Sequence, residues 1–350
     1  AFAWRERATD PDVLAARQTL RSADAHASWF AELAALGDGT PARPLIDALA
    51  RAGLLEPAAA LAAIRWARGA DARAEDLTTW LEQLGYTGEA ASIADTWSQR
   101  ARTADDERGL AAAFSKLGDL HVALGNADQA RRFFEDSLVI RRRLVDAEPG
   151  RADLQRDLSV SYNQLGDLHI ALGNADQARR FFEDSLVIRR RLVDAEPGRA
   201  DLLRDLSISY ERLGDLHRAL GNADQARRFF EDSLALAKRL VDAEPGRADL
   251  QRDLAISYER MATVDPDRAL PWLSAAVAIR RQRLAAEPAN AVVRRELAIT
   301  LLQLARHIEQ DEVVRVLRES YDLLQDLYRR GALEASYHRL VDQLRQVLSG

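Results

Sequence analysis

The stretch LGDLHIALGNADQARRFFEDSL at residues 165–186 occurs in nearly the same form at residues 117–138 and again at residues 213–234. The three copies therefore follow one another at a fixed period of 48 residues. A catalytic site needs one unique arrangement of side chains, whereas a stack of interchangeable units forms an extended surface. We therefore expect an array of structural repeats in which the shape of a surface matters more than a reactive group.

Each repeat predicts a pair of helices. In the second copy, apolar and aromatic residues recur every three or four positions over residues 152–172 and over residues 175–195, which is typical of one buried helical face. Gly173 and Asn174 between these segments indicate a helix end and a side chain that caps the next helix, and Pro197 ends the second helix. The sequence therefore predicts an all-α protein built from helical hairpins.

Several residues of each pair resemble the tetratricopeptide repeat, whose pattern is a large aromatic residue, Leu-Gly, a second aromatic residue, then Ala, Phe and Pro. The counterparts in the second copy are Tyr162, Leu165, Gly166, His169, Ala178, Phe182 and Pro197. The first and third copies share this register at Phe114, Leu117, Gly118, His121, Ala130 and Phe134, and at Tyr210, Leu213, Gly214, His217, Ala226 and Phe230. The period of 48 exceeds the family's usual 34 by two heptads, so the pattern is similar to long-helix bacterial versions of this repeat.

The resemblance implies an α-solenoid, a right-handed superhelix of antiparallel helix pairs with the first helix of each pair lining a concave groove. We expect an array of about five helical repeats over residues 103–331 and a capping helix within residues 332–350. Residues 1–102 hold five of the six tryptophans but lack the 48-residue period, so we expect a separate N-terminal helical region there, which degenerate repeats could form.

Composition limits the function further. The chain has no cysteine, so disulfides and thiolate sites are excluded, and the net charge of −6 disfavours nucleic acid and anionic membranes as partners. No long apolar run or signal peptide is visible, which predicts a cytoplasmic protein. Arginine supplies 47 of the 49 basic residues, as in a bacterium with a GC-rich genome, and the start at Ala1 suggests a fragment of a longer protein.

A second stripe on the first helix of each pair supplies the candidate binding residues. It lies one helical step from the core stripe, and the resemblance implies that this face binds extended peptides or partner helices. Asp119, Asp167 and Asp215 recur on this stripe, once per repeat, and we call them the acidic row. This row could receive a basic segment of the partner or could pair with arginines of adjacent helices. The predicted groove residues are Ser115, Asp119, Val122, Asn163, Asp167, Ile170, Glu211, Asp215, Arg218 and Glu259.

Two other sets of residues invite a functional interpretation. His121, His169 and His217 recur once per repeat, but helices pack about 8–10 Å apart, too far for one histidine per unit to share a metal ion, so we expect core packing and no metal site. Arginine clusters begin at Arg141, Arg189 and Arg280, and nearby acidic residues suggest solvated, salt-bridged faces and no nucleic-acid site.

The predicted function is therefore a non-catalytic scaffold that binds a protein or peptide, as the sensing or docking part of a larger bacterial regulatory or signalling protein. The alternative is an architectural spacer or a self-association module that organises effector domains. No nucleotide-binding loop, metalloprotease helix or nucleophile elbow is present, so we predict neither catalytic residues nor a cofactor.

Overall fold

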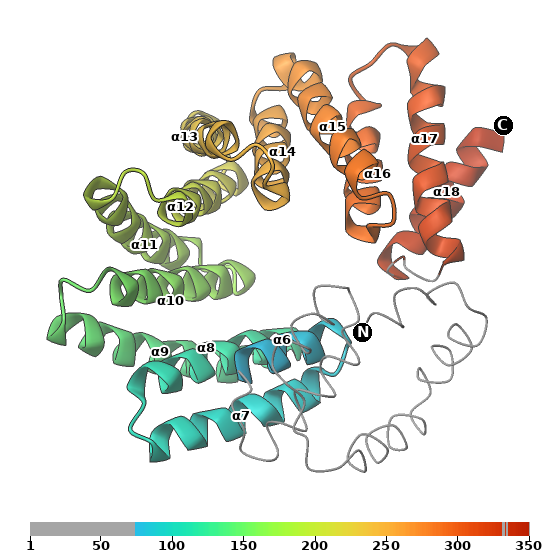
Figure 1. Ribbon diagram of the computed structural model, residues 1–350. Coiled ribbons are helices and arrows are strands. Elements are labelled where there is room, and N and C mark those ends of the chain that lie inside the picture. The colour runs from blue at the N-terminus through green and yellow to red at the C-terminus, as the bar shows by residue number, and fades with distance from the viewer. Residues whose placement is uncertain (1–73, 331–332, 334, 350) are drawn as a thin grey trace, which may run out of the picture. The chain divides into compact units, whose positions relative to one another are not determined.

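The computed structural model describes residues 74–330, 333 and 335–349, and over these residues it is helical and contains no β-strand (Figure 1). The predicted fold class is confirmed for these described residues, which form an all-α solenoid. Helix packing divides the chain into two units, residues 1–172 and residues 173–350. This division falls within the repeats, and the domain borders expected after residues 102 and 331 stay predictions.

The first unit contains five described helices, each packed against the next. They are α6 (Ala74–Gln83), α7 (Thr87–Thr103), α8 (Glu107–Ala123), α9 (Ala127–Ala147) and α10 (Ala152–Ala171). Most of the predicted N-terminal region lies outside the described residues. Phe114, Leu117 and Leu120 of α8 form a core with Ala94 of α7 and Ile140 of α9, so the three-and-four spacing read from the sequence marks the buried face.

The second unit continues the same alternation. Its elements are α11 (Ala175–Ala195), α12 (Ala200–Ala219), α13 (Ala223–Ala243), α14 (Ala248–Val264), the 3-10 turn η1 (Pro266–Arg268), α15 (Ala269–Ala286), α16 (Ala291–Leu304), α17 (Gln310–Arg329), η2 (Ala335–Tyr337) and α18 (His338–Ser349). Val341 and Leu344 of α18 pack on Leu324 and Leu327 of α17. We call α8, α10, α12, α14 and α16 the A helices, and α9, α11, α13, α15 and α17 the B helices.

The turn from an A helix to a B helix corrects one expectation. Gly125 and Gly221 adopt φ angles of 76°, where glycine carries no steric penalty, so the predicted helix ends are confirmed. An asparagine occupies the N-cap position of α9, α11 and α13, but neither Asn126 nor Asn174 makes a side-chain capping hydrogen bond. The Asn126 amide lies 3.4 Å from Nδ1 of His121 instead, so this side chain faces the preceding helix.

Within a hairpin, the A and B helices approach closely at a glycine. A Cβ atom added to Gly118 would lie 2.3 Å from the Phe134 ring, and one added to Gly214 would lie 2.4 Å from the Phe230 ring. Both rings are buried, with exposed fractions of 2% and 1%. The Leu-Gly and Phe positions of the repeat pattern therefore form one contact, in which the glycine makes room for the ring.

Candidate protein-binding face

Three apolar side chains are exposed on the A helices of the first unit. Val122 at the end of α8 is 44% exposed, and Val160 and Ile170 of α10 are 37% and 43% exposed. Val122 and Ile170 belong to the predicted groove stripe. We call the surface formed by Val122, Val160 and Ile170, together with Asp119 and Asp167, the A-helix face of the first unit.

Two residues of the predicted stripe lie inside the helix packing instead. Ser115 is 6% exposed and Asn163 is 4% exposed. The Ser115 hydroxyl lies 3.0 Å from the Ser137 hydroxyl of α9, which in turn donates to the Ala111 carbonyl. Ser115 therefore helps to join an A helix to its B helix, and neither Ser115 nor Asn163 presents its side chain to a partner.

Asp119 is accessible to solvent but forms a contact between successive A helices. The Gln164 amide of α10 donates to both of its carboxylate oxygens, at 3.2 and 3.1 Å. Despite its accessibility, protein atoms surround the carboxylate on several sides, and the loss of hydration raises the pKa of Asp119 to about 6. The first acidic group of the row is therefore partly protonated near neutral pH.

We expect Asp119→Asn to change the pH dependence of stability. The pKa of Asp119 is higher in the folded chain than in the unfolded one, so its contribution to stability is full below about pH 4 and is lost as the pH rises through about 6. Relative to the wild type, the variant should gain stability between pH 4 and pH 7, by less than about 1 kcal/mol because the side chain is exposed. Urea unfolding at both pH values measures this gain, and an equal difference at both would contradict it.

In the second unit, the acidic row is paired with arginine. Arg260 of α14 lies 3.0 Å from the carboxylate of Asp215 and 3.3 Å from that of Glu211, both on α12. Arg218 lies 3.4 Å from Asp215. Of the two interpretations of this row, pairing between adjacent helices therefore holds for Asp215. Burial raises the pKa of Glu211, whose side chain is 15% exposed.

Glu259, the last residue of the predicted stripe, forms a buried ion pair. Its carboxylate accepts two hydrogen bonds from the Arg280 guanidinium of α15, at 2.5 and 3.0 Å. Arg280 also donates to the Glu296 carbonyl of α16 at 2.9 Å and contacts the Thr300 hydroxyl. This one guanidinium therefore joins helices α14, α15 and α16.

The expectation that the arginine clusters are solvated is wrong for the first residue of each cluster. Arg141, Arg189 and Arg280 are only 8%, 4% and 3% exposed. Each reaches the next A helix, where it bonds to the backbone carbonyl 16 positions later and to the hydroxyl 20 positions later. The following residues do face solvent, as in the ion pair of Arg143 with Glu107. Burial forces the first arginine to satisfy its donors internally, which the sequence analysis missed.

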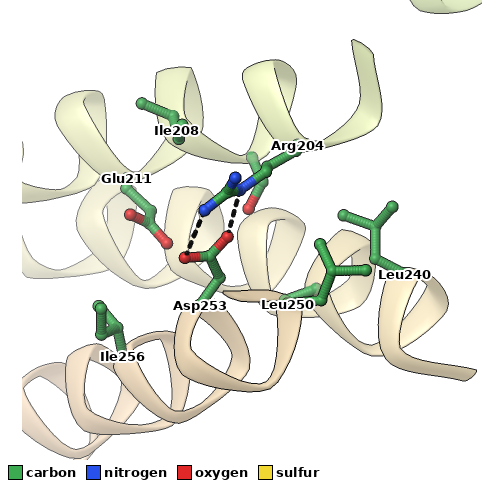
Figure 2. A pocket seen from close by; sticks show the side chains of 9 residues that line it. Arg204, Ile208, Glu211, Leu240, Leu250, Asp253 and Ile256 are labelled. Carbon is green, nitrogen blue, oxygen red and sulfur yellow. Dashed lines mark hydrogen bonds and ion pairs between the residues drawn. The ribbon is translucent and has the colours of Figure 1, made fainter. Parts of the chain in front are cut away.

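The third repeat has alanine at this position. Ala237 corresponds to Arg189, 48 residues earlier, and a cavity of about 30 Å³ lies beside it. Figure 2 shows its lining, with Arg204, Ile208 and Glu211 on α12 and Asp253 and Ile256 on α14. The full lining is Arg204, Ser207, Ile208, Glu211, Ala237, Leu240, Leu250, Asp253 and Ile256. Because Ala237 and Leu240 belong to α13, the cavity lies between this B helix and the A helices α12 and α14.

The repeated histidines pack against aromatic rings, as expected. The imidazole of His121 stacks on Phe133 with ring centres 5.3 Å apart, and that of His217 stacks on Phe229 at 5.5 Å. Burial lowers the pKa of His169 and of His217. Among the described residues, no group of three metal-ligating side chains is close enough to hold an ion, and no helix there has the length and apolar character to span a bilayer.

Sequence profiles described as tetratricopeptide repeat match residues 110–149, 157–220 and 207–282. Residues 110–149 and 157–282 of this chain are tetratricopeptide repeats. The close contact between Gly214 and Phe230 is the structural form of the repeat's Leu-Gly and Phe positions. The tetratricopeptide repeat is a scaffold for protein–protein interaction, and the array described here is such a scaffold. No curated protein matches the sequence.

Solved structures with similar folds include BtubC (BKLC) from P. vanneervenii, which is 18% identical. The alignment covers 75% of this chain and 92% of that one, with a TM-score of 0.50. TTC0263, a thermophilic TPR protein in Thermus thermophilus, is 20% identical over 65% of this chain and 96% of its own, with a TM-score of 0.40. At these identities the likeness concerns the fold alone.

Proposed function

We propose that this tetratricopeptide repeat protein is a non-catalytic docking scaffold that binds a protein or peptide on its A helices, as the sensing or docking part of a larger bacterial regulatory or signalling protein. The exposure of Val122, Val160 and Ile170 on successive A helices of one unit carries the proposal. Apolar side chains arranged in this way favour burial against a partner, at about 25 cal/mol per Å² of surface removed from water.

Charge next to these side chains supports a partner with a basic segment. Asp119 and Asp167 lie on the A-helix face of the first unit, where Asp119 is held by the neutral Gln164 amide. A cationic side chain of the partner would stabilise the ionised form of Asp119 and lower its raised pKa. Binding of a basic peptide should therefore release more protons at pH 6 than at pH 8. Calorimetry in buffers of different ionisation enthalpy measures this difference.

A double substitution tests the proposed face. We expect Val122→Asp with Ile170→Asp to weaken partner binding about tenfold or more, because two exposed apolar contacts are replaced by charges. The matched control is Val139→Asp on α9, which changes a side chain that is 66% exposed on a B helix. Proteins captured from an extract of the source organism by the wild-type chain would be identified, purified and titrated against all three chains. Equal affinity for the double variant and the wild type would contradict the proposed face.

The alternative, self-association, is favoured by exposed valines on the B helices. Val139 is 66% exposed and Val187 is 59% exposed, in the same position of consecutive repeats. If the protein organises assemblies through these side chains, its mass by light scattering should rise with concentration, and Val139→Asp should suppress the rise. A constant monomer mass over a hundredfold concentration range would leave the docking scaffold as the function.

A further inference from the structure

Four of the five B helices, α9, α11, α13 and α15, share one buried position. Arg141, Arg189 and Arg280 place a guanidinium there, and Ala237 is the exception. In the second repeat, for example, the Arg189 guanidinium bonds to the Asp205 carbonyl and lies 3.2 Å from the Ser209 hydroxyl. The repeats around Ala237 therefore show which chemical group this internal site is built to hold.

The groups that accept a guanidinium in the other repeats are kept in the third. Asp253 and Ser257 follow Ala237 by 16 and 20 positions, the spacing at which Arg189 meets Asp205 and Ser209. Asp253 lines the cavity. The Ser257 hydroxyl points to the Asp253 carbonyl at 3.1 Å and to the Glu211 carboxylate at 3.3 Å. The alanine thus removes the donor and keeps both residues that accept it elsewhere, of which Asp253 lines the cavity and Ser257, outside the lining, is bonded to Glu211.

Glu211 supplies a carboxylate in the position from which Glu259 binds a guanidinium. Its counterpart 48 residues later is Glu259, which holds the Arg280 guanidinium through two hydrogen bonds. At the cavity, Glu211 accepts instead from the Ser233 and Ser257 hydroxyls and meets Arg260 at 3.3 Å. Paired hydrogen bonds from a planar guanidinium to a carboxylate are stronger and more specific than contacts with a single hydroxyl.

The charges at the cavity are balanced. Its lining holds the carboxylates of Glu211 and Asp253, and each has one arginine partner: Asp253 is bonded to Arg204 at 2.5 Å (Figure 2), and Glu211 meets Arg260 at 3.3 Å. Ile208 and Ile256 supply apolar walls against which the methylenes or the flat faces of a guanidinium can pack. At about 30 Å³ the cavity has room for about two water molecules at roughly 10–15 Å³ each, so a guanidinium must displace them and move the lining side chains apart.

We propose that the cavity beside Ala237 binds the guanidinium group of an arginine side chain supplied by a protein partner. The partner's arginine takes the place that Arg189 and Arg280 fill in their own repeats, with Glu211 as its carboxylate. The identity of the ligand as a partner's side chain rests on the proposed docking function. The affinity of the cavity for a guanidinium does not, because it follows from the repeat comparison alone.

Methyl NMR of the full chain with methylguanidinium as the probe tests the site. Ile208 and Ile256 line the cavity, and their labelled δ1 methyl groups should show a saturable shift at millimolar probe concentration. Ile140 and Ile188, which precede Arg141 and Arg189, serve as internal controls and should not move. Methylammonium carries charge without the planar donors, so it should shift the two reporters at least about tenfold more weakly.

Two variants complete the test. Ala237→Arg supplies the guanidinium from within the chain, so its cavity should no longer respond to the probe, and the same isoleucine spectrum shows whether it folds. Glu211→Gln keeps the cavity and removes the charge, and should weaken the response about tenfold. The proposal is overturned if the wild type shows no saturable shift, if methylammonium acts equally well, or if both variants respond as the wild type does.

These outcomes are separate from those of the docking proposal. The titration needs no partner, so an inert cavity would leave partner binding on the A-helix face of the first unit intact. When a partner is in hand, Ala237→Arg should weaken its binding about tenfold, while a partner bound equally well would show that no arginine of that partner enters this cavity.

Discussion

Arg280→Ala is expected to lower the free energy of unfolding by about 3–5 kcal/mol, because it leaves a largely buried carboxylate without its partner. Glu259 is 17% exposed and receives both of its charged hydrogen bonds from Arg280. The same change removes the donor to the Glu296 carbonyl of the next repeat. The loss should appear in the midpoints of urea and thermal unfolding, followed by circular dichroism.

The neighbouring residue provides the matched control for this change. Arg281 also forms an ion pair, with Glu319 at 2.6 Å, but its side chain is 52% exposed. Removing an exposed pair costs less than about 1 kcal/mol, so Arg281→Ala should unfold close to the wild type. Similar losses in the two variants would contradict the distinction between the buried and the solvated arginine.

A second comparison separates the ion pair from the space that it fills. Replacing Arg280 and Glu259 together by methionine removes both charges while it keeps side-chain volume. Thr300 keeps a bond to the Glu296 carbonyl at 2.8 Å, so few polar groups are left without a partner. The double variant should therefore recover most of the stability lost in Arg280→Ala.

The helix bounds could be predicted because their signals are local. Gly173 and Pro197 lie just after helix ends, and the segment predicted as residues 152–172 is α10 (Ala152–Ala171). The segment predicted as residues 175–195 coincides with α11 (Ala175–Ala195). The bond made by Asn126 could not be predicted in the same way, because a side chain at the N-cap position can instead turn to the preceding helix.

The burial of Arg141, Arg189 and Arg280 could not be predicted from their charge, because a charged side chain is usually exposed. Arg141 follows the buried Phe134 by seven positions and Ser137 by four, which places it on the core stripe of α9. That spacing was available in the sequence, but the carbonyl of Asp157 that makes its burial possible belongs to the next repeat. Contacts between repeats depend on their packing, which residue spacing within one helix does not give.

Only part of the predicted stripe is exposed, because packing between helices also decides which of its residues are covered. Val122 and Ile170 are exposed where the stripe placed them, whereas Ser115 and Asn163 are buried between helices. One helical step separates the core stripe from the predicted stripe, and small polar residues at that boundary are covered by the adjacent helix. The cavity had a sequence signal as well: Ala237 replaces arginine at one of the four positions, 235–238, where α13 departs in sequence from α11.

Gly214→Ala should also be strongly destabilising, by about 3 kcal/mol, at the upper end of the range for overpacked cores. Alanine is the better helix former by about 1 kcal/mol, so helix propensity alone predicts the opposite sign. The added Cβ would lie 2.4 Å from the Phe230 ring, and that ring is itself 1% exposed. Neither helix can therefore relieve the clash without opening the hairpin.

The sign of the change in unfolding free energy of Gly214→Ala decides between the steric clash and helix propensity. Gly246→Ala is the matched control, because a Cβ atom at that glycine meets no atom within 4 Å and its backbone adopts no positive φ. Its unfolding midpoint should change by less than about 1 kcal/mol. A second substitution, Phe230→Leu in the Gly214→Ala background, shortens the opposing side chain and should restore part of the loss. If Gly214→Ala proved neutral or stabilising, the close approach of α12 and α13 at this residue would be wrong.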